Sequence, residues 1–232
     1  MKTIVKAAFA ILLLSGTIAH ADPVTVGNPN TGNCYPFMCN DSGTSSGVSI
    51  AYQEAYNSSA FPGPITIGSL GFGRYPMGPS TILGGNYLLL LDYSATGMGL
   101  SSNLYSNLTG TSTQLFAQLC VPPGGTDFRN MLVINGLPFN FDPSLGDLLL
   151  TVIATNQDLV PNYTGNGYNW ADSTGTDVIR AFAFGGSLDG SGAQTGALVT
   201  TFNPTPEPGT LLLLGTGLAG LASAIRKRIA RN

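Results

Sequence analysis

Residues 141–154 read FDPSLGDLLLTVIA, a short turn followed by an uncharged aliphatic run. The turn contains Asp-Pro and Gly, which set tight local geometry. The run that follows has the length of a strand and places Leu148–Leu150 in direct succession. Successive side chains of a strand point to opposite faces, so this run is apolar on both, as is Leu88–Leu91. The pattern predicts central strands covered by a second sheet on one side and by loops on the other.

Comparable runs recur along the chain, separated by turn-forming clusters such as Pro122–Gly125. Between residues 22 and 204, no apolar stripe has the period of a helix. The sequence therefore predicts an all-β fold, a single antiparallel β-sandwich over residues 22–204. The expected strands cover residues 48–56, 65–72, 87–93, 114–119, 131–134, 148–154, 178–184 and 197–202. Among these, Ile65-Thr66-Ile67 alternates and is expected to have one wet face.

The N-terminus has the pattern of a signal peptide. Lys2 and Lys6 precede an uncharged run over residues 7–18, which ends at Ala19-His20-Ala21. The run is about a dozen residues long, whereas a spanning helix needs roughly 20. We expect signal peptidase to use the small residues Ala19 and Ala21 and to cut after Ala21, which removes residues 1–21.

The C-terminal segment, residues 205–232, is a second hydrophobic address. Pro206-Glu207-Pro208 is followed by seventeen uncharged residues, four of them glycine, and then by the basic cluster of residues 226–231. The cations are expected to stay on the cytoplasmic side. An apolar helix of this length is at the low end of what spans a bilayer, so it suits a transient stop better than a permanent anchor.

The order of these three parts resembles the PEP-CTERM sorting signal of exopolysaccharide-making Gram-negative bacteria. The resemblance implies that an exosortase, a membrane-embedded cysteine transpeptidase-like enzyme, processes the chain near Pro206, Glu207 and Pro208. The chain is then the substrate and not the enzyme. The implied destination is the cell surface or the extracellular matrix, and the membrane is contacted only through the C-terminal helix before processing.

The middle of the chain also resembles a known type. Residues 52–62, then Ile65–Ile67 with Gly71-Phe72, and then residues 138–150 are similar to the jelly-roll-type β-sandwich of PEP-CTERM surface proteins. The resemblance implies a jelly-roll-like fold and an exported setting. It implies no agreed biochemical activity and no catalytic residue.

The composition between the two ends excludes several classes of function. Three arginines stand there against all twelve carboxylates, a net charge of −9 for residues 22–207. Such a chain repels nucleic acid, and its charge suits solubility or divalent cations. The only histidine, His20, lies in the signal peptide, which removes histidine-based catalysis and histidine zinc sites from the mature chain. We expect no enzymatic activity and no cofactor.

Three cysteines lie in a chain destined for an oxidising compartment. Cys34 and Cys39 are close enough in sequence to close a small loop, which leaves Cys120 odd. The alternative is that one of them pairs with Cys120 across the domain. Three thiols are too few for a structural zinc or iron–sulfur site.

Two acidic segments are candidates for chemistry. The segment from Asp172 to Asp177 concentrates acidic and hydroxyl oxygens, as hard cations prefer, but it lacks the EF-hand pattern, and an ordinary polar loop is the alternative. Asp142 and Asp147 flank a turn. They would serve the turn itself, calcium, or, as a carboxylate pair, glycoside hydrolysis.

Aromatic residues are the third candidate. Tyr163, Tyr168 and Trp170 fall in a stretch rich in Asn and Gly, which we expect to be a loop. Exposed aromatic faces beside amides can stack on sugar rings, while a lone tryptophan can instead serve packing.

The sequence therefore predicts a non-enzymatic exported protein with a structural, adhesive or carbohydrate-binding role at the surface or in the exopolysaccharide matrix of a biofilm. Its expected partners are exosortase, signal peptidase and extracellular polysaccharide. The alternative is a secreted carboxylate-dependent polysaccharide hydrolase.

Overall fold

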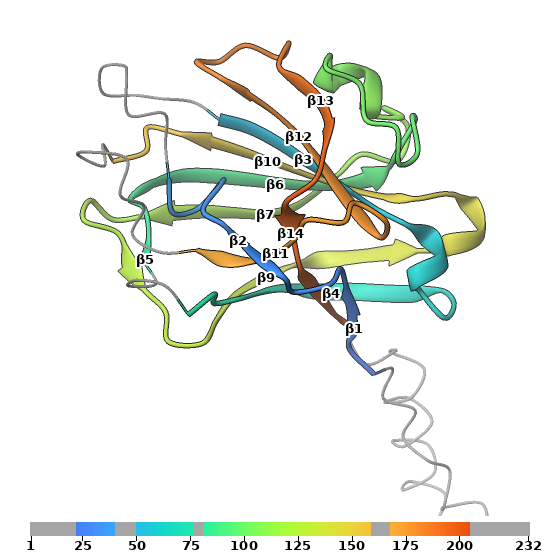
Figure 1. Ribbon diagram of the computed structural model, residues 1–232, viewed down its shortest axis with the longest axis horizontal. Coiled ribbons are helices and arrows are strands. Elements are labelled where there is room, and N and C mark those ends of the chain that lie inside the picture. The colour runs from blue at the N-terminus through green and yellow to red at the C-terminus, as the bar shows by residue number, and fades with distance from the viewer. Residues whose placement is uncertain (1–21, 40–49, 77–80, 159–167, 205–232) are drawn as a thin grey trace, which may run out of the picture. The chain divides into compact units, whose positions relative to one another are not determined.

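The computed structural model describes residues 22–39, 50–76, 81–158 and 168–204 (Figure 1). The predicted signal peptide and sorting segment lie outside these residues, so the structure says nothing of Ala19, Ala21, Pro206, Glu207 or Pro208. Residues Pro23–Pro204 form one compact unit.

The described chain is all-β and antiparallel, with two large sheets and two small ones. In spatial order, the six-stranded sheet consists of β13 (Ser191–Gln194), β12 (Val178–Phe184), β3 (Ile50–Tyr56), β10 (Leu148–Thr155), β6 (Gly85–Tyr93) and β7 (Gln114–Val121). The four-stranded sheet consists of β1 (Val24–Val26), β15 (Thr200–Pro204), β4 (Ile65–Gly73) and β9 (Met131–Phe141). The prediction of an antiparallel β fold is confirmed.

The small sheets and three 3₁₀ turns join these strands. One small sheet contains β14 (Ala197–Leu198), β11 (Asn169–Asp172) and β2 (Thr31–Asn33), and the other contains β5 (Thr81–Ile82) and β8 (Thr126–Asp127). The turns are η1 (Ser58–Ala60), η2 (Leu104–Asn107) and η3 (Pro143–Leu145). Because β14 continues into β15 after one residue, the three-stranded sheet adjoins the four-stranded one.

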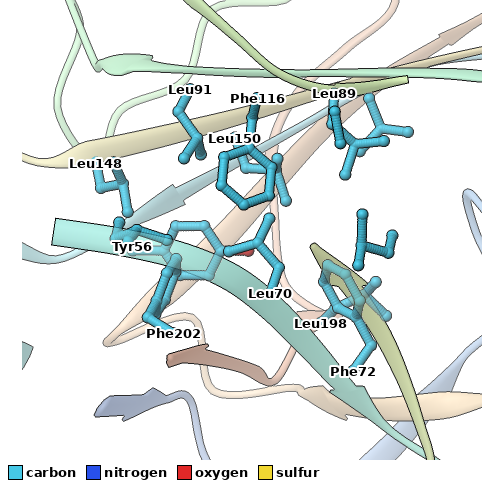
Figure 2. Close-up of a cluster of buried hydrophobic side chains, with 14 of the residues drawn as sticks. Tyr56, Leu70, Phe72, Leu89, Leu91, Phe116, Leu148, Leu150, Leu198 and Phe202 are labelled. Carbon is cyan, nitrogen blue, oxygen red and sulfur yellow. The ribbon is translucent and has the colours of Figure 1, made fainter. Parts of the chain in front are cut away.

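The chain crosses repeatedly between the two large sheets. It passes from β3 to β4 and back to β6, from β7 to β9 and back to β10, and finally from β13 through β14 to β15. Each crossing brings apolar side chains of both sheets into one layer. Figure 2 shows this layer, in which Leu150 of β10 lies with Leu70 of β4 and Phe202 of β15. Removing apolar surface from water in this way is the main force holding the sheets together.

The central strand β3 is buried on both faces, and its residues differ between them. Tyr52, Glu54 and Tyr56 face the layer between the sheets, while Ala51 and Ala55 join a second apolar cluster on the far side. That cluster also contains Leu100, Leu104 and Leu149 and lies under the segment that carries η2. The prediction that Leu148–Leu150 forms a strand covered on both faces is confirmed, because all three residues are buried.

Asp92 fastens this covering segment to the end of β6. Its carboxylate accepts hydrogen bonds from the Thr109 amide (3.0 Å), from the Thr109 and Thr113 hydroxyls (2.6 Å each) and from the Ser112 hydroxyl. Burial opposes the charge, but these hydrogen bonds outweigh it and hold the pKa of Asp92 below its usual value. The carboxylate therefore stays ionised and keeps the segment in place.

Candidate functional site

Three aromatic rings gather where the three-stranded sheet adjoins β4, and we call Tyr75, Tyr168 and Trp170 the aromatic cluster. Tyr75 stands two residues after β4, and its backbone N–H donates to the carbonyl of Tyr168 at 2.8 Å. The ring centroids of Tyr75 and Trp170 are 4.6 Å apart at an interplanar angle of 84°, and those of Tyr75 and Tyr168 are 6.5 Å apart at 79°. Both are edge-to-face contacts.

The backbone around the cluster is shaped to receive these rings. Gly32 of β2 lies opposite Trp170 in the ladder, and a Cβ on it would be 3.0 Å from both Tyr168 Cβ and Tyr75 Cδ1. Glycine therefore leaves the room that the two tyrosines occupy. Tyr75, Tyr168 and Trp170 are each half-buried.

The sequence foresaw only part of the cluster. Trp170 was expected in a loop, which is wrong, because it lies in strand β11, where pairing with β2 and β14 fixes its direction. Tyr163 lies outside the described residues. Tyr75 was not foreseen, since nothing local in Arg74-Tyr75-Pro76 points to a partner more than ninety residues away.

Of the predicted cation ligands, Asp172 uses its carboxylate and Asp177 its backbone carbonyl in contacts within the domain. The buried Asp172 carboxylate accepts the amides of Asn28 (2.8 Å) and Thr174 (2.7 Å) and the Thr174 hydroxyl (2.5 Å). Burial opposes its charge, but these donors hold its pKa below the usual value. Asp177 contributes its carbonyl to the Asn57 amide at 2.9 Å. Among the described residues, no group of three His, Cys, Asp or Glu side chains is placed to hold a metal.

Asp142 and Asp147 likewise stabilise turns. Asp142 caps η3 through the Ser144 amide at 2.9 Å, and hydrogen bonds from the Ser144 side chain and then from its amide lower the pKa of Asp142. Asp147 accepts the Ser58 amide at 2.7 Å and so ties the start of β10 to η1. Each carboxylate thus accepts a backbone amide in the way that turn-forming aspartates do.

The cysteines are arranged as one of the two predicted alternatives. A disulfide joins Cys34 to Cys39, and Cys120 on β7 is free and exposed. The small loop that the disulfide closes carries Phe37 and Met38 into the main core. It thereby attaches the N-terminal part of the domain to the layer between the sheets.

A buried polar centre, which the sequence reasoning missed, surrounds Glu54. Its carboxylate accepts the hydroxyls of Tyr52 (2.6 Å) and Tyr56 (2.5 Å) and the backbone amide of Leu198. Burial raises the pKa of Glu54 to about 7, although the hydrogen bonds and the charge of Arg180, its cross-strand neighbour, act in the opposite direction. The alternation of Tyr52, Glu54 and Tyr56 on one strand face was the available signal.

The C-terminus decides the class of the protein. A model of the PEP-CTERM protein-sorting motif matches residues 204–228. The chain carries a PEP-CTERM sorting signal. The match begins at Pro204, the last residue of β15, and covers the Pro-Glu-Pro motif, the apolar run and the first basic residues.

The PEP-CTERM motif indicates an exported substrate of exosortase in a Gram-negative bacterium, held transiently at the membrane. No curated protein and no solved structure matches the chain significantly. Among the residues that the structure describes, no helix is long and apolar enough to cross a membrane. The predicted C-terminal helix lies outside them.

Proposed function

We propose that this PEP-CTERM protein is a non-enzymatic component of the cell surface or exopolysaccharide matrix, where its β domain adheres to polysaccharide through the aromatic cluster. The observation that carries this proposal is the convergence of Tyr75, Tyr168 and Trp170 from separate segments into one half-exposed group. Tyrosine and tryptophan combine an apolar ring with a polar group, and such rings can stack on the C–H faces of sugars.

The carboxylates support the non-enzymatic part of the proposal. Asp92, Asp142, Asp147 and Asp172 each accept hydrogen bonds that hold a turn or a loop. Glu54 is enclosed between the sheets. A glycosidase instead needs two carboxyl groups that face one substrate across a defined separation. No described contact favours the hydrolase alternative.

The test uses the protein recovered from the extracellular fraction of its host and affinity electrophoresis in gels that contain the host's own exopolysaccharide. We expect the polysaccharide to retard the protein, and Trp170→Ala and Tyr168→Ala each to weaken retention by about tenfold or more. Tyr105→Ala is the matched control, because Tyr105 is an exposed ring on η2 outside the cluster, at 66% exposure. It should leave retention unchanged.

Equal retention of wild type and both cluster variants, at unchanged melting temperature, would overturn the proposed contact. A rise in reducing ends when the protein is incubated with the polysaccharide would overturn the non-enzymatic assignment and favour the hydrolase.

A further inference from the structure

The outward side of the four-stranded sheet is an unusual surface, which we call the uncharged face. Its central cross-strand rows are Thr25–Thr201–Gly71–Val133 and Asn203–Ser69–Asn135. Strands β1, β15, β4 and β9 contain no Asp, Glu, Lys or Arg at any position. Outward positions of a solvent-facing sheet commonly carry charge, especially near its edges. Here the polar groups are hydroxyls and amides alone.

The uncharged face continues into the aromatic cluster. Gly73 ends β4 on the outward side, and a Cβ there would lie 3.2 Å from Trp170 Cδ1. The indole therefore packs against the same side of β4. On the next outward residue, Gly71, a Cβ would lie 2.7 Å from the sulfur of Met131. Met131 and Trp170 thus fill the space over two glycines, and the rings and the rows share one surface.

Apolar groups lie next to hydroxyls and amides on this surface, as C–H faces lie next to hydroxyl groups on a sugar chain. Met131 and Val133 remain 41% and 49% exposed on the outer strand β9. Toward the opposite edge of the sheet the hydroxyls of Thr25 and Thr201 are 2.9 Å apart, and Asn203 Nδ2 of β15 donates to Ser69 Oγ of β4 at 3.0 Å. Each of these hydroxyl groups keeps further capacity to donate or accept. Apolar patches beside hydroxyls and amides complement the C–H faces and hydroxyl edges of pyranose rings.

Charge distinguishes between classes of polysaccharide. Residues 22–207 carry a net charge of −9, so a polyanion is repelled by the domain as a whole. Arg74 and Arg129, which follow β4 and precede β9, are the cations nearest to the face in sequence. Arg74 stands between Gly73 and Tyr75, and its guanidinium donates to the Arg129 carbonyl at 3.4 Å. A polycation would find no carboxylate on the four strands. A neutral polysaccharide is not repelled by the net charge and needs no carboxylate on the four strands.

We propose that a neutral polysaccharide strand lies on the uncharged face, stacked on the aromatic cluster at one end and hydrogen-bonded to the Thr, Ser and Asn rows along the sheet. This inference rests on the proposed function and adds the ligand class and the extent of the site. From Gly73 to Ser69 the strand covers about 13 Å, the length of two to three sugar rings beyond the tryptophan.

The test introduces one negative charge on the face and one elsewhere. Val133→Glu and Asn135→Glu place a carboxylate on exposed outward positions of β9, and Gln118→Glu places it on an exposed position of β7. The probes are β-1,4-glucan and galactomannan as neutral polymers and alginate as a polyanion. We expect retention by at least one neutral polymer and none by alginate. Because a buried charge must lose its water, both β9 variants should bind about tenfold more weakly, while Gln118→Glu binds as wild type does.

The outcomes separate this inference from the proposed function. If Trp170→Ala abolishes retention and neither β9 variant affects it, the cluster binds sugar and the extended site is wrong. If alginate alone is retained, the neutral ligand is wrong. If a β9 variant converts a dimer to a monomer in analytical ultracentrifugation without affecting retention, the face is a self-association surface and the inference is overturned. If no polymer retains the wild-type protein, the host's polysaccharide included, both proposals are overturned.

Discussion

Replacing Glu54 by glutamine should remove a pH dependence from the stability of the domain. Glu54 is completely buried, and burial raises its pKa from an ordinary 4.5 to about 7. In the unfolded chain the carboxyl loses its proton near pH 4.5, whereas the folded protein holds the proton up to about pH 7. Between these values the unfolded state gains stability relative to the folded state.

This difference in pKa sets the direction and size of the change in unfolding free energy with pH. The contribution of Glu54 is fully present below pH 4.5 and is lost as the pH rises to about 7. Since one unit of pKa is worth about 1.4 kcal/mol, the loss across this window is about 3 kcal/mol. Glutamine has nearly the same shape and can still accept from Tyr52, while its amide can donate to Tyr56. The variant should therefore fold without the pH-dependent loss.

The assay is urea unfolding followed by circular dichroism at pH 5.0 and 7.5. We expect the urea midpoint of the wild type to be lower at pH 7.5 than at pH 5.0. The urea midpoint of Glu54→Gln should change much less. Asp92→Asn is the matched control and should keep the wild-type difference between the two pH values. A carboxyl with a lowered pKa, such as that of Asp92, loses its stabilising effect only on acidification below about pH 4. If the wild-type midpoint rises from pH 5.0 to 7.5, Glu54 is ionised and compensated by Arg180, and the reasoning is refuted.

Three further substitutions test the fold. Asp92→Ala leaves the donors of residues 109–113 without their acceptor, and we expect a loss of about 1–3 kcal/mol in urea unfolding and faster proteolysis after β6. Gly136→Ala places a Cβ 2.5 Å from the buried ring of Phe116 and should lower the unfolding free energy by about 1–3 kcal/mol. Its control is Gly63→Ala, whose Cβ meets nothing within 4 Å and should leave stability almost unchanged. Equal melting temperatures of the two variants would contradict this packing. Cys39→Ser opens the disulfide loop and should lower the unfolding free energy by about 2 kcal/mol, an effect that a reducing agent should reproduce on the wild type but not on the variant.

The sequence predicts strands well where local chemistry is sufficient. The aliphatic and aromatic run 178–184 has the same bounds as β12, and the run 148–154 is β10 without its last residue. In β9 the prediction ended at Ile134, seven residues too early. Asn135, Gly136 and Pro138 resemble a turn, but Pro138 is accommodated because β9 is at the end of the sheet.

The candidate site was harder to predict because its residues are positioned by partners that are distant in the sequence. Thr31-Gly32-Asn33 has no strand pattern of its own, yet β2 pairs with β11 across more than 130 residues and sets the direction of Trp170. The same pairing brings Tyr168 beside Tyr75. The uncharged face arises from four strands that are ordinary one by one. Only their pairing shows that these strands lie side by side and form one surface.

The most direct test of export and sorting is the intact mass of the protein from the extracellular or surface fraction of its native host, with both terminal peptides mapped. The account predicts a chain that begins at Asp22 and ends near Pro208, no earlier than residue 205. The lower bound follows from β15, because Phe202 is buried in the core and Pro204 completes the strand. A mature chain that keeps residues 226–232 would contradict the sorting-substrate assignment and make the C-terminal helix a permanent anchor.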